Sequence, residues 1–210
     1  MHSNELAKIN MLESYFQRLP RFIQNHSQAV AYYTEMLMKQ LVILQEEMAY
    51  LPPALLPKAD LLGRYHDIGK VGISNEIWEA AAPLKPMEKK LVQMHPIIGA
   101  YIVQEEIKPL LSIVMSADIS VCLAQSCACH HEHWNGKGYP FQLKREEIPL
   151  CARIVGIADA FDAMTADRPY HKGISKEAAL REIRKNAGKQ FDPNLARIFC
   201  YLMQDRALVG

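Results

Sequence analysis

The sequence lacks the features that mark a membrane-spanning, secreted or nucleic-acid-binding protein. No apolar run reaches the length of about 20 residues that a membrane-spanning helix needs, and the N-terminus has no signal-peptide core. Charge of neither sign predominates, because 24 lysines and arginines stand against 23 aspartates and glutamates. The five cysteines are odd in number and follow no repeated spacing, which indicates reduced thiols. We therefore expect a cytoplasmic protein with no membrane and no nucleic-acid polymer among its partners.

The alternating pattern of β-strands is nearly absent as well, and apolar residues recur at helical spacing instead, as in Val30, Leu37 and Leu41. Half of the 210 residues are hydrophobic, which is enough for a sizeable core in one domain. We expect a long helix over residues 110–131, helices over 153–165 and 175–187, and loops over 69–86 and 135–140. The sequence therefore predicts an all-α helical bundle.

The most informative residues are the adjacent His66 and Asp67, followed by Lys70. An imidazole nitrogen can bind one metal, and a carboxylate has two oxygens with which it can bridge two metals. A lysine one helical turn later can reach an anion held on those metals. The pair alone is a weak signal, but further candidate ligands follow in apolar surroundings: His95, His130, His131 and Asp159. Together they predict a buried cluster of two or more metal ions.

Each of these residues also has a simpler interpretation. His95, taken alone, is more simply a hydrogen-bonded core histidine, and Lys70 could be a solvated surface lysine. Asp159 could form a cap or a structural ion pair. Two adjacent buried imidazoles at 130 and 131 would, however, be an expensive way to pack a core. Cys127 and Cys129 are expected as small core residues rather than zinc ligands.

In this order and spacing, the motifs resemble those of the HD-GYP family. The resemblance extends from about residue 26 to residue 199 and is carried by five segments: His66-Asp67-Ile68-Gly69-Lys70, His95-Pro96, His130-His131-Glu132, Gly138-Tyr139-Pro140 and residues 159–170. It implies an HD-superfamily helical bundle with a short GYP loop. We expect an N-terminal helical extension over residues 1–24 and the catalytic domain over residues 25–205.

The resemblance also implies roles for single residues. Seven match the family's metal ligands by position: His26, His66, Asp67, His95, His130, His131 and Asp159. Lys70 matches a lysine that contacts phosphate, and Tyr139 matches a loop tyrosine near the substrate. Arg168 matches an arginine that binds the substrate. His171 stands where family members usually carry a basic arginine or lysine, so its contribution to substrate binding is expected to depend on pH.

The activity that the resemblance implies is hydrolysis of the 3′,5′-phosphodiester of cyclic di-GMP to pGpG, GMP or both, by attack of a metal-bridged hydroxide. Asp67 would bridge the metals, and Lys70 would offset charge that develops on the phosphate. Two alternatives stay open. One is an HD-type phosphohydrolase that acts on another cyclic dinucleotide or nucleotide. The other is a non-catalytic module that binds a cyclic dinucleotide.

Two departures from the family pattern affect these expectations. Some members have a glutamate one helical turn before the upstream histidine, where it serves a third metal, and Phe22 stands at that position here. We therefore expect two divalent metal ions, iron or manganese, with zinc or nickel as alternatives. The loop carries His133, Asn135 and Lys137 where the family more often has arginine, aspartate and a small residue, so its net charge is more positive, which could alter the preference among cyclic dinucleotides. A homodimer, and contacts with a diguanylate cyclase or a regulator protein, are left open.

Overall fold

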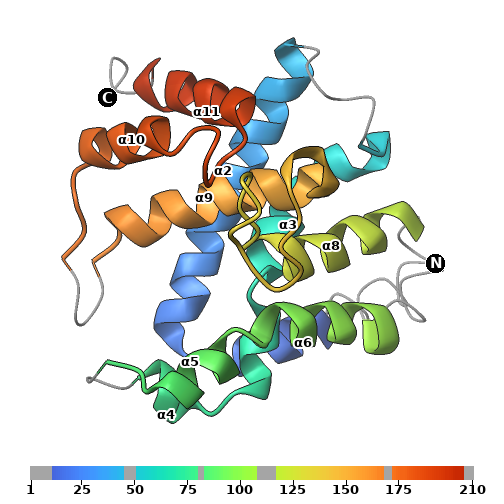
Figure 1. Ribbon diagram of the computed structural model, residues 1–210. Coiled ribbons are helices and arrows are strands. Elements are labelled where there is room, and N and C mark those ends of the chain that lie inside the picture. Colours follow the sequence, from blue (N-terminus) through green and yellow to red (C-terminus); the bar gives the residue numbers. More distant parts are fainter. Residues whose placement is uncertain (1–10, 45–50, 80–82, 108–116, 168–171, 206–210) are drawn as a thin grey trace.

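The computed structural model describes residues 11–44, 51–79, 83–107, 117–167 and 172–205 (Figure 1). Within these ranges the secondary structure is helical, with two isolated bridges, Asn135–Lys144 and Ala187–Phe191, and no strand. The all-α class predicted from the sequence is therefore confirmed. None of the helices in these ranges is both long and apolar enough to cross a membrane.

Five longer helices form the frame of the molecule: α2 (Arg21–Leu44), α8 (Ala117–Cys129), α9 (Leu150–Thr165), α10 (Lys176–Lys185) and α11 (Pro193–Asp205). Residues 11–17 are also helical. Shorter helical segments connect the longer ones: η2 (Pro53–Lys58), α3 (Ala59–Tyr65), η3 (Ile68–Gly72), α4 (Asn75–Trp78), α5 (Pro86–Val92), α6 (His95–Tyr101), the π-helix η4 (Ile102–Ile107) and η5 (Arg145–Glu147).

Helix α9 lies at the centre of the bundle and contacts α2, α3 and α8 on one side and α10 and α11 on the other. Figure 1 shows α10 and α11 side by side at one end, with α6 running along α8 at the opposite end. The core between these helices is continuous and includes the fully buried Leu37, Leu62, Leu123, Val155 and Phe199. Its burial follows from the helical spacing of the apolar residues seen in the sequence.

Local capping defines where the C-terminal helices begin. The carboxylate of Asp192 accepts hydrogen bonds from the backbone N–H groups of Asn194 and Leu195, at 2.8 and 3.3 Å, and caps the N-terminus of α11. The hydroxyl of Ser175 accepts from Ala178 N at 3.2 Å and caps α10 in the same way. These caps supply partners for amides that a helix leaves unsatisfied at its first turn.

The structure corrects the helix boundaries at three places. The loop expected over residues 69–86 contains η3 and α4. Helix α8 ends at Cys129, so His130 and His131 lie in the turn that follows it rather than inside it. Helix α9 begins at Leu150, directly after Pro149, because proline is well suited to the start of a helix and leaves no amide unpaired there.

The N-terminal segment shares the main core. Leu12 and Phe16 are buried in the same cluster as the helices of the bundle, and Glu13 accepts two hydrogen bonds from Arg64 at 2.9 and 3.0 Å. Helix α2 runs without interruption across the boundary expected between residues 24 and 25. His26 is thereby held in a helix that is anchored on both sides of this boundary.

Gly69 allows η3 and α6 to approach each other closely. A Cβ atom at this position would lie 2.0 Å from the backbone oxygen of His95 and 2.3 Å from the nitrogen of Gly99. Both obstacles are backbone atoms, so the two segments would have to separate to admit any side chain. This close packing places His66 and Asp67 directly beside His95.

We predict that Gly69→Ala lowers the free energy of unfolding by about 1–3 kcal/mol, the usual range for overpacking a filled core. Gly72→Ala in the same segment is the matched control, because its Cβ would meet only the side-chain end of Ile98 at 3.0 Å. Chemical denaturation of both variants measures the difference. Equal losses for the two variants would contradict the close approach at Gly69.

Candidate metal centre

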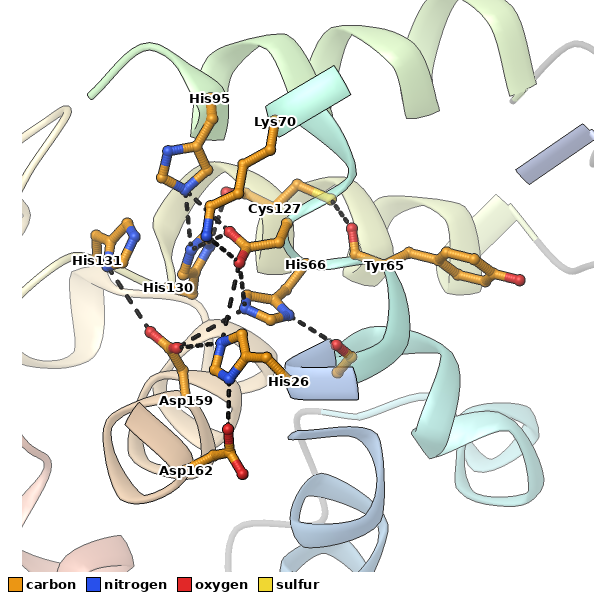
Figure 2. A network of polar contacts seen from close by, with 12 residues as sticks. His26, Tyr65, His66, Lys70, His95, Cys127, His130, His131, Asp159 and Asp162 are labelled. Carbon is orange, nitrogen blue, oxygen red and sulfur yellow. Dashed lines mark hydrogen bonds and ion pairs between the residues drawn. The ribbon is translucent and has the colours of Figure 1, made fainter. Parts of the chain in front are cut away.

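The structure brings together all seven residues that the sequence predicts as metal ligands (Figure 2). They come from five parts of the fold: His26 from α2, His66 and Asp67 from the junction of α3 and η3, His95 from the start of α6, His130 and His131 from the turn after α8, and Asp159 from α9. They form two groups: the His95 group (Asp67, His95, His130, His131) and the His26 group (His26, His66, Asp159). Within each group the candidate ligand atoms lie within 4.8 Å of one another.

Backbone carbonyls orient three of the histidines. His66, His95 and His130 each donate Nδ1–H to the carbonyl of a residue three or four positions earlier, at 2.7, 2.6 and 2.9 Å. In a neutral imidazole this arrangement places the proton on Nδ1 and leaves the lone pair of Nε2 directed into the cluster. Such a second hydrogen bond is the usual companion of a metal-binding histidine.

The Nε2 atoms of these histidines converge on the same space. The Nε2 atoms of His95 and His130 face each other at 3.4 Å, and Nε2 of His66 is buried without a hydrogen-bond partner among the described residues. Burial lowers the pKa of His130 well below its usual range and that of His131 to about 4, so both rings are neutral near pH 7. Neutral imidazoles whose lone pairs converge need a cation between them, and this donor set fits divalent metals.

Asp67 lies between the two groups. Its Oδ1 is 3.2 Å from Nε2 of His95, and its Oδ2 is 3.4 Å from Nε2 of His66. Burial alone would raise the pKa of Asp67, but Lys70 and His66 outweigh burial and hold the pKa well below its usual range. The side chain is therefore an ionised carboxylate with one oxygen toward each group. Asp159 also faces both groups, with Oδ1 3.0 Å from His26 and Oδ2 3.9 Å from His131.

Lys70 and Tyr139 lie at the edge of the cluster. The Nζ atom of Lys70 is 2.5 Å from Oδ2 of Asp67 and 5.1 Å from the ring centroid of Trp78. The ring of Tyr139 stacks on His131 with centroids 4.7 Å apart. Burial and the nearby carboxylates of Asp67 and Asp159 raise the pKa of Tyr139, so its hydroxyl stays protonated. Both side chains can donate hydrogen bonds to an anion placed on the cluster.

Three other positions complete the sequence-based predictions. Arg168 and His171 lie outside the described residues. Phe22, one turn before His26 on α2, is partly buried and packs against the hydrophobic core.

The model of the HD domain family matches residues 10–195 of the chain. The chain belongs to the HD-GYP family of HD domains.

Relatives of this HD-GYP chain are named for different substrates. A cyclic di-GMP phosphodiesterase from Thermotoga maritima is 38% identical over 140 residues, which are 67% of this chain and 36% of that protein. The 3′3′-cGAMP-specific phosphodiesterase 3 from Vibrio cholerae is 34% identical over 187 residues, which are 89% of this chain and 35% of that protein. This chain therefore spans about a third of the length of these curated relatives.

A solved structure shares the fold. A HDG"Y"P protein from Bdellovibrio bacteriovorus superposes with a TM-score of 0.60 at 20% identity, over 87% of this chain and 52% of that one. At this identity the similarity shows the fold alone.

Sequence reasoning missed one residue of the HD-GYP site, Asp162. Its Oδ2 lies 2.6 Å from Nδ1 of His26, in the place that backbone carbonyls take for the other histidines. Asp162 follows Asp159 by three positions on α9, and this spacing was the signal that it faces the same way. Burial alone would lower the pKa of His26, but the hydrogen bonds that its ring donates to the carboxylates of Asp159 and Asp162 outweigh burial and raise the pKa to about 9. In metal-free protein His26 is therefore protonated at neutral pH and must lose this proton to bind a metal.

We predict that the stability of the metal-free protein is greatest near pH 6.5. The raised pKa of His26 stabilises the fold fully below 6.5, and this contribution of roughly 3 kcal/mol is lost as the pH rises toward 9. The lowered pKa of His131 acts in the opposite sense, because folding then disfavours protonation and stability is lost as the pH falls from 6.5 toward 4. Chemical denaturation of chelator-treated protein from pH 4.5 to 9 measures both parts of the stability profile, the loss above pH 6.5 (the alkaline limb) and the loss below it (the acid limb).

Asp162→Asn is the control for this prediction. The variant keeps the size of the side chain but lacks the charge that raises the pKa of His26, so the alkaline limb should flatten while the acid limb stays. An unchanged alkaline limb would show that Asp162 does not set the protonation of His26.

Proposed function

We propose that this protein hydrolyses the 3′,5′-phosphodiester of cyclic di-GMP and releases pGpG, GMP or both. The observation that carries the proposal is the pair of ligand groups, with one oxygen of Asp67 facing each group and the histidine Nε2 atoms directed inward. The Thermotoga maritima relative is named as a cyclic di-GMP phosphodiesterase, which supports the same reaction. We also propose a cytoplasmic location. A homodimer and contacts with a diguanylate cyclase or a regulator stay predictions.

The seven clustered residues would hold two divalent metals, one in the His95 group and one in the His26 group. Phe22 offers no donor atom for a third. A mixture of imidazole and carboxylate donors suits iron and manganese, and also accepts zinc or nickel. Bound metals would supply Lewis-acid polarisation of the phosphate and activation of water.

Lys70 would offset the negative charge that grows on the non-bridging phosphate oxygens. Its ammonium is held between the carboxylate of Asp67 and the face of Trp78, and the side chain is 17% exposed, so one side remains accessible to a ligand. A positioned charge in a largely buried site stabilises a transition state without reorganising during the reaction. Lys70 therefore acts on the rate more than on the metals.

Tyr139 would donate a hydrogen bond from its protonated hydroxyl to the substrate. Its ring is fixed against His131, so the hydroxyl is directed by the same segment that carries the ligands. By resemblance to the family, Arg168 would bind a phosphate or a guanine edge through two parallel hydrogen bonds, and a protonated His171 would add a second positive charge.

A second candidate substrate is 3′3′-cGAMP. The Vibrio cholerae relative named for this substrate aligns with 89% of the chain. Lys137, in the loop between His131 and Tyr139, adds a positive charge that would attract the phosphates of either cyclic dinucleotide. The competing class of function is a module that binds a cyclic dinucleotide without turnover.

A substrate panel tests the proposal. The full chain, purified anaerobically, is analysed for bound metals and then incubated with cyclic di-GMP, 3′3′-cGAMP and a nucleotide monoester, with chelator-treated protein as control. Turnover of cyclic di-GMP above the other compounds supports the proposal. Turnover of 3′3′-cGAMP alone reassigns the substrate, and tight binding without turnover in metal-loaded protein overturns the enzymatic function.

We predict different effects for two variants of neighbouring residues. Asp67→Ala should reduce the metal content of both groups and abolish turnover, because an oxygen of Asp67 faces each group. Lys70→Ala should retain the metals and lower kcat by on the order of 10²- to 10³-fold, as for removal of one preorganised electrostatic contact. Elemental analysis and steady-state kinetics measure both. Near-native activity in Asp67→Ala would rule out its proposed role.

A further inference from the structure

Glu132 is a buried carboxylate that lies outside both ligand groups. It directly follows His130 and His131 in the chain and is 6% exposed. Its Oε1 accepts hydrogen bonds from the backbone N–H groups of Phe141 and Gln142, at 2.6 and 3.1 Å, and its Oε2 accepts one from Leu143 at 3.1 Å. Three successive amides directed at one carboxylate form an anion-binding nest, which compensates the burial of the charge.

These hydrogen bonds close the loop that carries Tyr139. The chain leaves the cluster after His131, and the amides of residues 141–143 return it to the side chain of Glu132. Gly138 makes the return possible, because a Cβ atom there would lie 2.5 Å from Cα of Glu132. The amide of Tyr139 donates to the carbonyl of His131 at 3.2 Å, and the two rings stack. Tyr139 is thus held between the cluster and the segment that Glu132 binds.

We infer that Glu132 is a positioning residue, which fixes the hydroxyl of Tyr139 over the cluster by holding residues 141–143. This role rests on the proposed function of the site. Glu132 belongs to neither group of candidate ligands, and both of its oxygens accept hydrogen bonds from backbone amides.

Glutamine cannot replace this carboxylate. Its amide oxygen can accept from the N–H groups of two residues, but its NH₂ group would face the N–H of the third, so a donor would meet a donor. Glu132→Gln therefore keeps the size of the side chain while it releases one end of the loop. Glu147→Gln is a matched control, because Glu147 also accepts from a backbone amide of this loop, that of Lys144 at 2.8 Å, but is exposed.

The test is a double-mutant cycle with Glu132→Gln and Tyr139→Phe, with metal content measured for every variant. Tyr139→Phe should lower kcat/KM about 10- to 100-fold, as for loss of a hydrogen bond to a charged group. Glu132→Gln should lower kcat/KM by a similar factor with metal content unchanged, and should have little further effect in the Tyr139→Phe background. Glu147→Gln should stay within about twofold of wild type. Additive effects of Glu132→Gln and Tyr139→Phe would overturn the inference.

Amide hydrogen exchange provides a readout that does not depend on turnover. The amides of Phe141, Gln142 and Leu143 should exchange slowly in the wild-type protein and faster in Glu132→Gln, with exchange in α8 and α9 unchanged. Equal exchange at these three amides in both proteins would overturn the inference even if the chain hydrolyses cyclic di-GMP. If no cyclic dinucleotide is hydrolysed by wild type, the proposed function fails, while the exchange experiment still decides whether Glu132 holds the loop.

Discussion

Hydrogen bonds from histidine Nδ1 atoms to oxygens of the scaffold are the interactions on which the metal centre depends. Backbone carbonyls accept hydrogen bonds from the Nδ1 atoms of His66, His95 and His130. The carboxylate of Asp162 faces the same atom of His26. Each contact fixes a ring and turns Nε2 toward the centre. Because the carbonyls belong to the helical turns that carry the histidines, the ligand directions follow directly from the fold of the backbone.

The two groups differ in their electrostatic surroundings. In the His95 group, burial keeps His130 and His131 neutral and ready to bind a metal. In the His26 group, His26 has carboxylates at both ring nitrogens and retains a proton until a metal displaces it. Metal binding should therefore release a proton mainly from the His26 group. The carboxylates of Asp67 and Asp159 face both groups, so occupancy of one group alters the field in the other.

The residues proposed to contact the substrate are held by the same segments as the candidate ligands. Lys70 lies one turn after Asp67 in η3, and Tyr139 is stacked on His131 in a loop that returns to Glu132. Close packing at Gly69 and Gly138 brings these segments together without intervening side chains. The candidate metal ligands and the groups that would contact a phosphate thus share one frame, and a shared frame favours precise alignment of reacting groups.

The helical class and six of the seven candidate ligands were readable from the sequence, because residue type, spacing and periodicity are local properties, whereas His26 was identified by the resemblance to the family. The grouping of the ligands was not, because it depends on five segments that meet only when α2, α3, α6, α8 and α9 pack. The role of Asp162 required its distance to His26, 136 positions earlier in the chain. The hydrogen bonds of Glu132 likewise depend on a loop returning to its origin. The sequence determined which atoms can bind a metal, and tertiary packing decided which way they point and which of them share a site.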